Sequence, residues 1–249
     1  MDRALLLQQW ARHTFLRFRG AVAYVETVGH TGDPGIGTCF HVGEGVFVTA
    51  RHVIDGRTIV KIDFDDWDAS RELLGDDPSQ WGRKQEFPIV LSGPHFHPDP
   101  RVDVACFRLG RTPSAVIPLG GHLDDWLGQY DLVLHRCLIM GYPPIPMADR
   151  ALLFATVGEV NALVDLYGSH KHPHFIVSSM GRGGLSGAPA LIAYNELSDD
   201  GTAALGLVTE SLILQNWSIE SGYLAVLTVE PIYVCLEHHG LLPELQKIV

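Results

Sequence analysis

Short runs of β-branched and aromatic residues, divided by Gly, Pro, Asn or Asp, occupy most of this 249-residue chain. The segments 21–26 and 60–64 alternate with a period of two residues, which is typical of strands with one buried face. Further β-rich runs lie at 87–92, 102–109, 133–140, 152–166, 174–179, 188–194, 203–213 and 223–230. About a dozen short strands with turns between them predict an all-β barrel or sandwich rather than βαβ units.

A short helix is predicted near each end of the chain. Residues 1–16 place Leu6 and Trp10 one helical turn apart, and a helix at 231–239 has Pro231 in its first turn. The join between two β units is expected near 111–128, where Pro and Gly cluster. The predicted division is an N-terminal helix (1–17), a first β unit (18–115), a second β unit (116–230), and a C-terminal helix with a tail (231–249).

Composition and charge exclude several classes of protein. A hydrophobic share of 46% and a charged share of 19% predict a soluble globular protein with a well-filled core. No apolar run approaches the roughly 18 residues of a membrane span, and no signal-peptide core forms at the N-terminus. The formal charge is −11, with five Lys/Arg against twelve Asp/Glu in residues 126–249. Neither nucleic acid nor a membrane is therefore an expected partner.

The four cysteines form no dense framework and no CxxC pair; they are Cys39, Cys106, Cys137 and Cys235. This usage favours a reducing setting, and the cytoplasm is the predicted location.

Three polar residues stand out against the strand pattern. Ser186 lies in the glycine-rich stretch Gly183–Pro189, His52 ends the run Val46–Val53, and Asp103 opens the run at 102–109. A serine hydroxyl is a weak nucleophile at neutral pH, so it needs a base and donors for the oxyanion that it generates. Glycines beside the serine free backbone N–H groups for that second task.

The order histidine, aspartate, serine resembles that of chymotrypsin-like serine peptidases, and not that of subtilisins or α/β-hydrolases. Within this family the chain is most similar to disulfide-free bacterial members and HtrA-type proteases. The resemblance spans roughly residues 35–230 and implies two packed six-stranded antiparallel Greek-key β-barrels with the active site between them. The further segments that carry it are Gly35–Phe40, Thr49–Val53, Asp103–Ala105, Met140–Pro143, Ala155–Val160 and Gly206–Thr209.

The resemblance assigns roles in a peptidase that acts on polypeptides and needs no metal or cofactor. His52 is the expected general base and later the acid, and Asp103 orients and stabilises its imidazole. The backbone N–H groups of Gly184 and Ser186 are the expected oxyanion hole. Asp99 is a rival acid, but prolines flank it and it leads into no strand.

By alignment on Ser186, Met180 is the expected floor of the primary specificity pocket. Thr209, Glu210 and Ser211 are the expected pocket wall and the strand that pairs with substrate. A methionine floor offers no counter-ion, so a small or medium apolar residue is predicted before the scissile bond. The Glu210 carboxylate could instead receive a cation at the pocket mouth.

Leu185 departs from secreted members of the family, which have an aspartate at this position that pairs with a freshly cleaved N-terminus. Leucine cannot form that ion pair. The sequence therefore leaves two expectations, constitutive activity or activation by a partner protein that orders the 181–184 loop.

Several alternatives remain open at this point. His95 and His97, or His170, His172 and His174, offer metal ligands, although prolines mark these segments as loops. The acidic segment 63–77 offers oxygen ligands for calcium. An α/β-hydrolase would use Ser186 with Asp199 or Asp200 and then His238 or His239, but Ala188 stands where the elbow motif needs glycine. A pseudopeptidase that only binds peptides is the other class.

Overall fold

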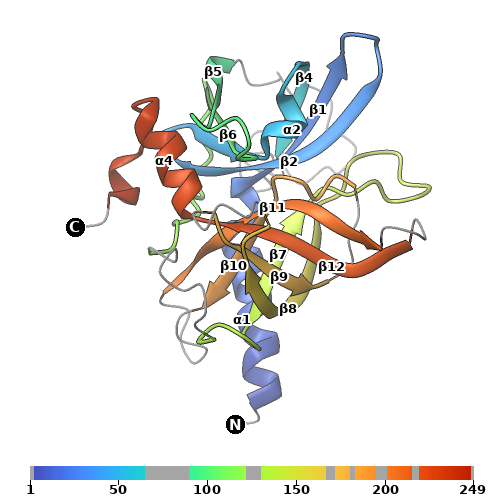
Figure 1. The fold of residues 1–249 in the computed structure, drawn as a ribbon, viewed down its shortest axis with the longest axis vertical. Coiled ribbons are helices and arrows are strands. Elements are labelled where there is room, and N and C mark those ends of the chain that lie inside the picture. The colour runs from blue at the N-terminus through green and yellow to red at the C-terminus, as the bar shows by residue number, and fades with distance from the viewer. Residues whose placement is uncertain are drawn as a thin grey trace, which may run out of the picture.

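The computed structural model describes residues 3–64, 90–121, 130–166, 172–179, 183–193, 201–214 and 219–247. It contains two six-stranded antiparallel sheets, shown one above the other in Figure 1. The strands of the first sheet are β1 (Val22–Gly29), β2 (Pro34–Gly43), β3 (Val46–Thr49), β4 (Arg57–Phe64), β5 (Val90–Phe96) and β6 (Ala105–Leu109). Those of the second are β7 (Arg136–Gly141), β8 (Phe154–Val164), β9 (His174–Ser178), β10 (Pro189–Ala193), β11 (Thr202–Leu214) and β12 (Ile219–Thr228).

The predicted all-β class with two six-stranded antiparallel units is confirmed, and the units differ in closure. The second sheet is a closed barrel in the order β10-β11-β12-β9-β8-β7. The first has the order β4-β1-β2-β3-β6-β5 and is a half-barrel, because β4 and β5 stand at its two edges in the described residues. The segment that joins these two edges, 65–89, lies outside the described residues.

The helices lie at the ends of the chain and at one short turn. α1 (Arg3–Phe18) is followed by the 3-10 turn η1 (Arg19–Ala21), and α2 (Arg51–Ile54) is a single turn after β3. α4 (Glu230–His238) follows β12 and precedes the 3-10 turn η4 (Glu244–Gln246). None of the described helices is long and apolar enough to cross a membrane.

The core follows from strands that are apolar on both faces. All residues of β3 and β10 are buried, and apart from Thr49 they are apolar, so these strands show continuous rather than alternating apolar character. In the first sheet the rings of Phe47 and Phe107 stack with their centroids 5.9 Å apart.

Polar contacts hold the C-terminal turn and join the two sheets. In η4, the Gln246 side chain donates to the carbonyls of Val42 at 2.6 Å and Ile117 at 3.0 Å, and it accepts from Leu119 N–H at 2.8 Å. The Tyr142 hydroxyl, after β7, donates to the carbonyl of Val22 at 3.3 Å. The Gln246 contacts hold the C-terminal turn against β2 and the segment between the sheets, and the Tyr142 contact joins the two sheets, on both of which the candidate site depends.

Two strand predictions differ from the structure at the site. The run ending in His52 is a strand only to Thr49, and the run at 102–109 is a strand only from Ala105. Val102 and Val104 are nevertheless fully buried. Their apolar character therefore reflects core packing of a loop, which local periodicity does not separate from a strand.

Candidate active site

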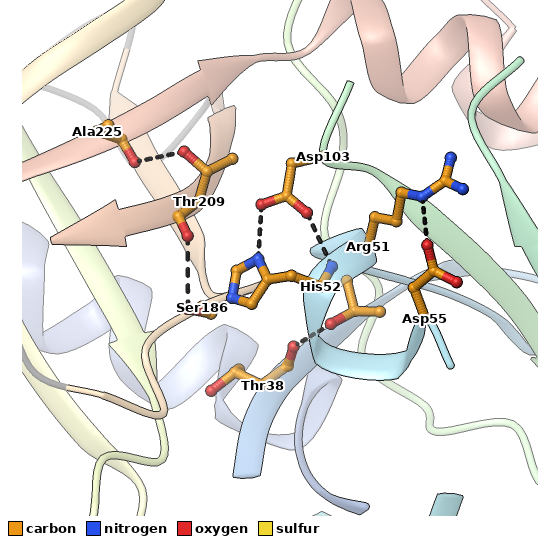
Figure 2. Close-up of polar contacts among 9 residues, drawn as sticks. Thr38, Arg51, His52, Asp55, Asp103, Ser186, Thr209 and Ala225 are labelled. Atoms are coloured by element: carbon orange, nitrogen blue, oxygen red, sulfur yellow. Dashed lines mark hydrogen bonds and ion pairs between the residues drawn. The ribbon is translucent and has the colours of Figure 1, made fainter. Parts of the chain in front are cut away.

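His52 and Asp103 are brought together by the pairing of two strands. β3 and β6 are antiparallel neighbours, with Thr49 opposite Ala105. His52 lies on α2, just after the end of β3, and Asp103 lies just before the start of β6. Both residues are therefore at the same end of this pair of strands. The Asp103 carboxylate accepts a hydrogen bond from the backbone N–H of His52 at 2.9 Å and one from its Nδ1 at 2.7 Å (Figure 2).

The bond at Nδ1 determines the tautomer of the imidazole. An ionised carboxylate can only accept, so the Nδ1 of His52 must carry a proton. In the neutral ring Nε2 is then a free base. Figure 2 shows the ring between the Asp103 carboxylate and the Ser186 side chain.

Ser186 lies in the turn between β9 and β10, which belong to the second sheet. Its hydroxyl donates to the carbonyl of Thr209 on β11 at 3.5 Å. Among the described residues no hydrogen bond joins Ser186 to His52. Such contacts are often long before substrate binds and shorten in the reactive complex.

The pKa of His52 reflects opposing effects. Burial lowers it, whereas the hydrogen bond and charge of Asp103 and the charge of Glu210 raise it, and the net direction is upward from the ordinary value. The side chain is 51% exposed, so solvent screens part of these interactions. The negative groups stabilise an imidazolium, the form that His52 would take after accepting a proton.

The turn that carries Ser186 requires glycine at two positions. Gly184 and Gly187 have φ of +87° and +83°. A Cβ at Gly184 would lie 2.5 Å from the carbonyl oxygen of Tyr142, and one at Gly187 would lie 2.1 Å from that of Thr38. Any side chain would therefore be both strained and obstructed.

The carbonyl groups of Gly184, Leu185 and Ser186 are paired, whereas none of the three N–H groups of these residues donates a hydrogen bond within the described chain. The carbonyl of Leu185 accepts from Ala188 N–H at 2.8 Å, and that of Ser186 accepts from Thr38 N–H at 2.9 Å. The N–H groups of Gly184 and Ser186 are the two predicted for the oxyanion hole.

The residues predicted to form the pocket and the substrate-pairing strand differ in how exposed they are. Glu210 on β11 is exposed, and Ser211 beside it is half-buried. The Thr209 side chain is buried, and its hydroxyl donates to the Ala225 carbonyl at 3.3 Å. Met180 lies outside the described residues.

The rival acid is engaged elsewhere. Asp99 forms an ion pair with Arg101, with 2.6 Å between Oδ2 and Nη2. Hydrogen bonds from the Arg101 side chain hold the pKa of Asp99 well below its ordinary value. The structure thus brings Asp103, and not Asp99, to His52.

The metal alternatives gain no geometric support. The rings of His97 and His172 lie 5.6 Å apart, and those of His95 and His239 lie 4.7 Å apart. No group of three or more His, Cys, Asp or Glu that could hold a metal ion is found among the described residues. His170 and most of the acidic segment 63–77 lie outside them.

The α/β-hydrolase alternative is wrong, because that fold is built on a mostly parallel sheet and both sheets here are antiparallel. His239, one of the candidate histidines of that alternative, instead forms a hydrogen bond through Nε2 with the Phe96 carbonyl at 2.8 Å. Asp199 and Asp200 lie outside the described residues.

Comparison with known families agrees with this architecture. Residues 37–197 match the model of the trypsin-like peptidase domain, and this chain belongs to that family. It is thus a serine protease of trypsin-like type. A search of curated proteins found no match.

Solved structures show the same fold at low sequence identity. The active form of the Rv3671c protease from M. tuberculosis is 19% identical, with a TM-score of 0.61 over 95% of this chain and 86% of that one. The HtrA-type protease AlgW with a tripeptide is 16% identical, with a TM-score of 0.60 over 95% and 64%. A serine endoprotease from Yersinia pestis is 16% identical, with a TM-score of 0.58 over 93% and 66%.

The sequence reasoning missed one residue at the site. Thr38, on β2, contacts the Ser186 turn through its backbone and its hydroxyl. Thr38 lies in the segment Gly35–Phe40 that carries the family resemblance, but a threonine in a strand is an ordinary choice, so no local signal indicates its contact with the Ser186 turn.

Proposed function

We propose that this protein is an endopeptidase that cleaves polypeptides through an acyl-enzyme, with His52, Asp103 and Ser186 as its catalytic triad. The observation that carries the proposal is the pair of hydrogen bonds from His52 to Asp103, at 2.9 and 2.7 Å. One fixes the main chain of the histidine and the other fixes its tautomer, which is the function of the acid in such a triad.

In the first half of the reaction, Ser186 Oγ attacks the scissile carbonyl carbon while His52 Nε2 takes the hydroxyl proton. The carbonyl oxygen becomes an oxyanion, which the N–H groups of Gly184 and Ser186 stabilise. When the C–N bond breaks, His52 gives its proton to the leaving amine, and the acyl group remains on Ser186. In the second half, a water molecule gives a proton to His52 Nε2 as its oxygen attacks the acyl carbon. The bond from that carbon to Ser186 Oγ then breaks, His52 returns the proton to Oγ, and the peptide acid leaves.

For substrate positioning, we propose that the chain segment Thr209–Ser211 pairs with the substrate backbone. The Thr209 carbonyl, which the Ser186 hydroxyl reaches at 3.5 Å, would be available to a substrate N–H once that hydroxyl turns toward His52. Met180 as the pocket floor, the apolar preference and the cytoplasmic location stay predictions.

Labelling with a fluorophosphonate tests the proposal, because this reagent phosphonylates only an activated serine. The wild-type protein should be labelled and should hydrolyse a fluorogenic peptide, whereas Ser186→Ala and His52→Ala should do neither. Ser178→Ala is the matched control, since among the described residues that β9 hydroxyl donates to the Glu159 carbonyl at 3.3 Å and does not contact the triad. A folded wild-type protein that resists labelling yet binds peptides would favour the pseudopeptidase alternative.

A further inference from the structure

Thr38 joins the Ser186 turn to two other segments of the chain. It is fully buried on β2. Its hydroxyl donates to the carbonyl of Gly184 at 2.7 Å and accepts from the N–H of Tyr142 at 3.0 Å. Its backbone N–H donates to the Ser186 carbonyl at 2.9 Å, and its carbonyl accepts from the Thr49 hydroxyl at 2.7 Å.

These bonds act on Gly184 and Ser186, the two residues whose N–H groups are the predicted oxyanion donors. The Thr38 hydroxyl fixes the carbonyl of Gly184, and the backbone N–H of Thr38 fixes that of Ser186. Gly184 has a φ of +87°, a region where glycine has several accessible conformations. Because the carbonyl of one residue shares a peptide plane with the N–H of the next, these two bonds fix the planes on both sides of the one that contains the Ser186 N–H. The plane that contains the Gly184 N–H is the next one along the chain, so its freedom is restricted as well.

Leu185, between Gly184 and Ser186, contributes packing and no charge. Leu185 is fully buried. Together with Thr38 and Ala188 it lies so close to Gly141 that an added Cβ there would come within 3.0 Å of all three side chains. Leucine at this place cannot hold the turn through an ion pair, so its polar restraint has to come from elsewhere.

We propose that Thr38 is a positioning residue that holds the Gly184 and Ser186 N–H groups in place for the oxyanion, in the absence of any activating cleavage. A neutral hydroxyl on β2 of the first sheet thus takes the task that an ion pair at position 185 has in cleavage-activated relatives. This inference rests on the proposed function, and it favours constitutive activity over activation by a partner.

Thr38→Val removes the hydroxyl at nearly constant volume and leaves the Gly184 carbonyl without its donor. Loss of an oxyanion donor typically costs about 100- to 1000-fold in kcat. Here both donors remain but are less well held, so a loss of about 10- to 100-fold in kcat is expected, with KM changed by no more than about threefold. Thr38→Ser, which keeps the hydroxyl, should recover most of the activity.

A second measurement separates positioning from general destabilisation. A peptide aldehyde forms a tetrahedral adduct with an oxyanion, whereas the corresponding peptide alcohol does not. For Thr38→Val, the affinity for the aldehyde should fall at least tenfold while that for the alcohol stays within about threefold. Thr228→Val is the matched control, because Thr228 is fully buried and its hydroxyl has no partner among the described residues.

The outcomes distinguish the two proposals. If the wild-type protein is not labelled by fluorophosphonate, the proposed function fails. If it is labelled but Thr38→Val binds the aldehyde as the wild type does, the inference on Thr38 is overturned. Should Thr38→Val not fold, Thr38→Ala is measured in its place, and wild-type aldehyde affinity in that variant overturns the inference equally.

Discussion

Replacing Asp103 by asparagine tests the site through its best-defined contact. The carboxylate of Asp103 accepts two hydrogen bonds, from the backbone N–H and from Nδ1 of His52. Asparagine has the same shape but only one acceptor oxygen, so it satisfies one of these donors. If the amide oxygen keeps the backbone N–H of His52, its NH2 group faces Nδ1.

A donor facing Nδ1 reverses the tautomer of the imidazole. Nδ1 must then accept, and the ring proton moves to Nε2, the atom that has to receive the proton of Ser186. A wrong tautomer in a triad of this kind lowers kcat by about 10⁴-fold, or roughly 5 kcal/mol of transition-state stabilisation. The variant also loses the Asp103 interactions that raise the pKa of His52, so its remaining activity should persist to lower pH than in the wild type.

The assay is kcat/KM on a fluorogenic peptide between pH 5 and 9, with Asp99→Asn as the matched control. Asp99 is an aspartate four residues away that pairs with Arg101, so its replacement should change kcat/KM by less than about threefold, as expected for an exposed ion pair. Activity of Asp103→Asn within tenfold of the wild type would refute the tautomer argument. A large loss in Asp99→Asn would show that the wrong acid has been chosen.

Three further predictions address pH, metals and specificity. In the wild type, protonated His52 cannot act as a base, and the pKa of His52 is raised. The value of kcat/KM should therefore rise with pH through one ionisation above the ordinary histidine pKa of about 6.5. Full activity at pH 4.5 that survives in His52→Ala would remove this residue from the mechanism. EDTA should leave hydrolysis intact, because the chain itself supplies the proposed nucleophile, base and oxyanion donors. A complete loss of hydrolysis that zinc restores would revive the histidine metal site, and a lower Tm alone would point to calcium in the acidic segment 63–77. A fluorogenic library varied before the scissile bond should show a preference for small or medium apolar residues; a strong preference for Arg or Lys that disappears in Glu210→Ala would mean that the pocket is assigned wrongly.

How much of this could be read from the sequence depends on whether the signal is local. Strand positions were largely predictable, because alternation and turn residues report on a few neighbouring residues. The glycines around Ser186 were also informative, since positive φ at Gly184 and Gly187 leaves little other choice. The start of β6 within the run at 102–109 was not predictable, because the buried loop residues Val102 and Val104 are as apolar as strand residues.

Contacts between distant segments had no local signal. The approach of His52 to Asp103 depends on the pairing of β3 with β6, whose register places Thr49 opposite Ala105. The half-open first sheet likewise depends on which edges pair. The order of the motifs along the chain predicted that these residues act together, but the distances come from strand register and not from any single segment.

The site is divided between the two sheets, and this division has a consequence for how the protein fails. His52 and Asp103 belong to the first sheet, and Ser186 to the second. The described hydrogen bonds between the sheets near the site include those of Thr38 to Gly184 and Ser186, and that of the Tyr142 hydroxyl to the Val22 carbonyl. The buried core is continuous across both sheets, so weakening these few bonds can displace a site residue while the core stays folded. Since misplacing reacting groups by about 1 Å can cost on the order of 100-fold in rate, activity should be lost at smaller perturbations than the folded structure itself.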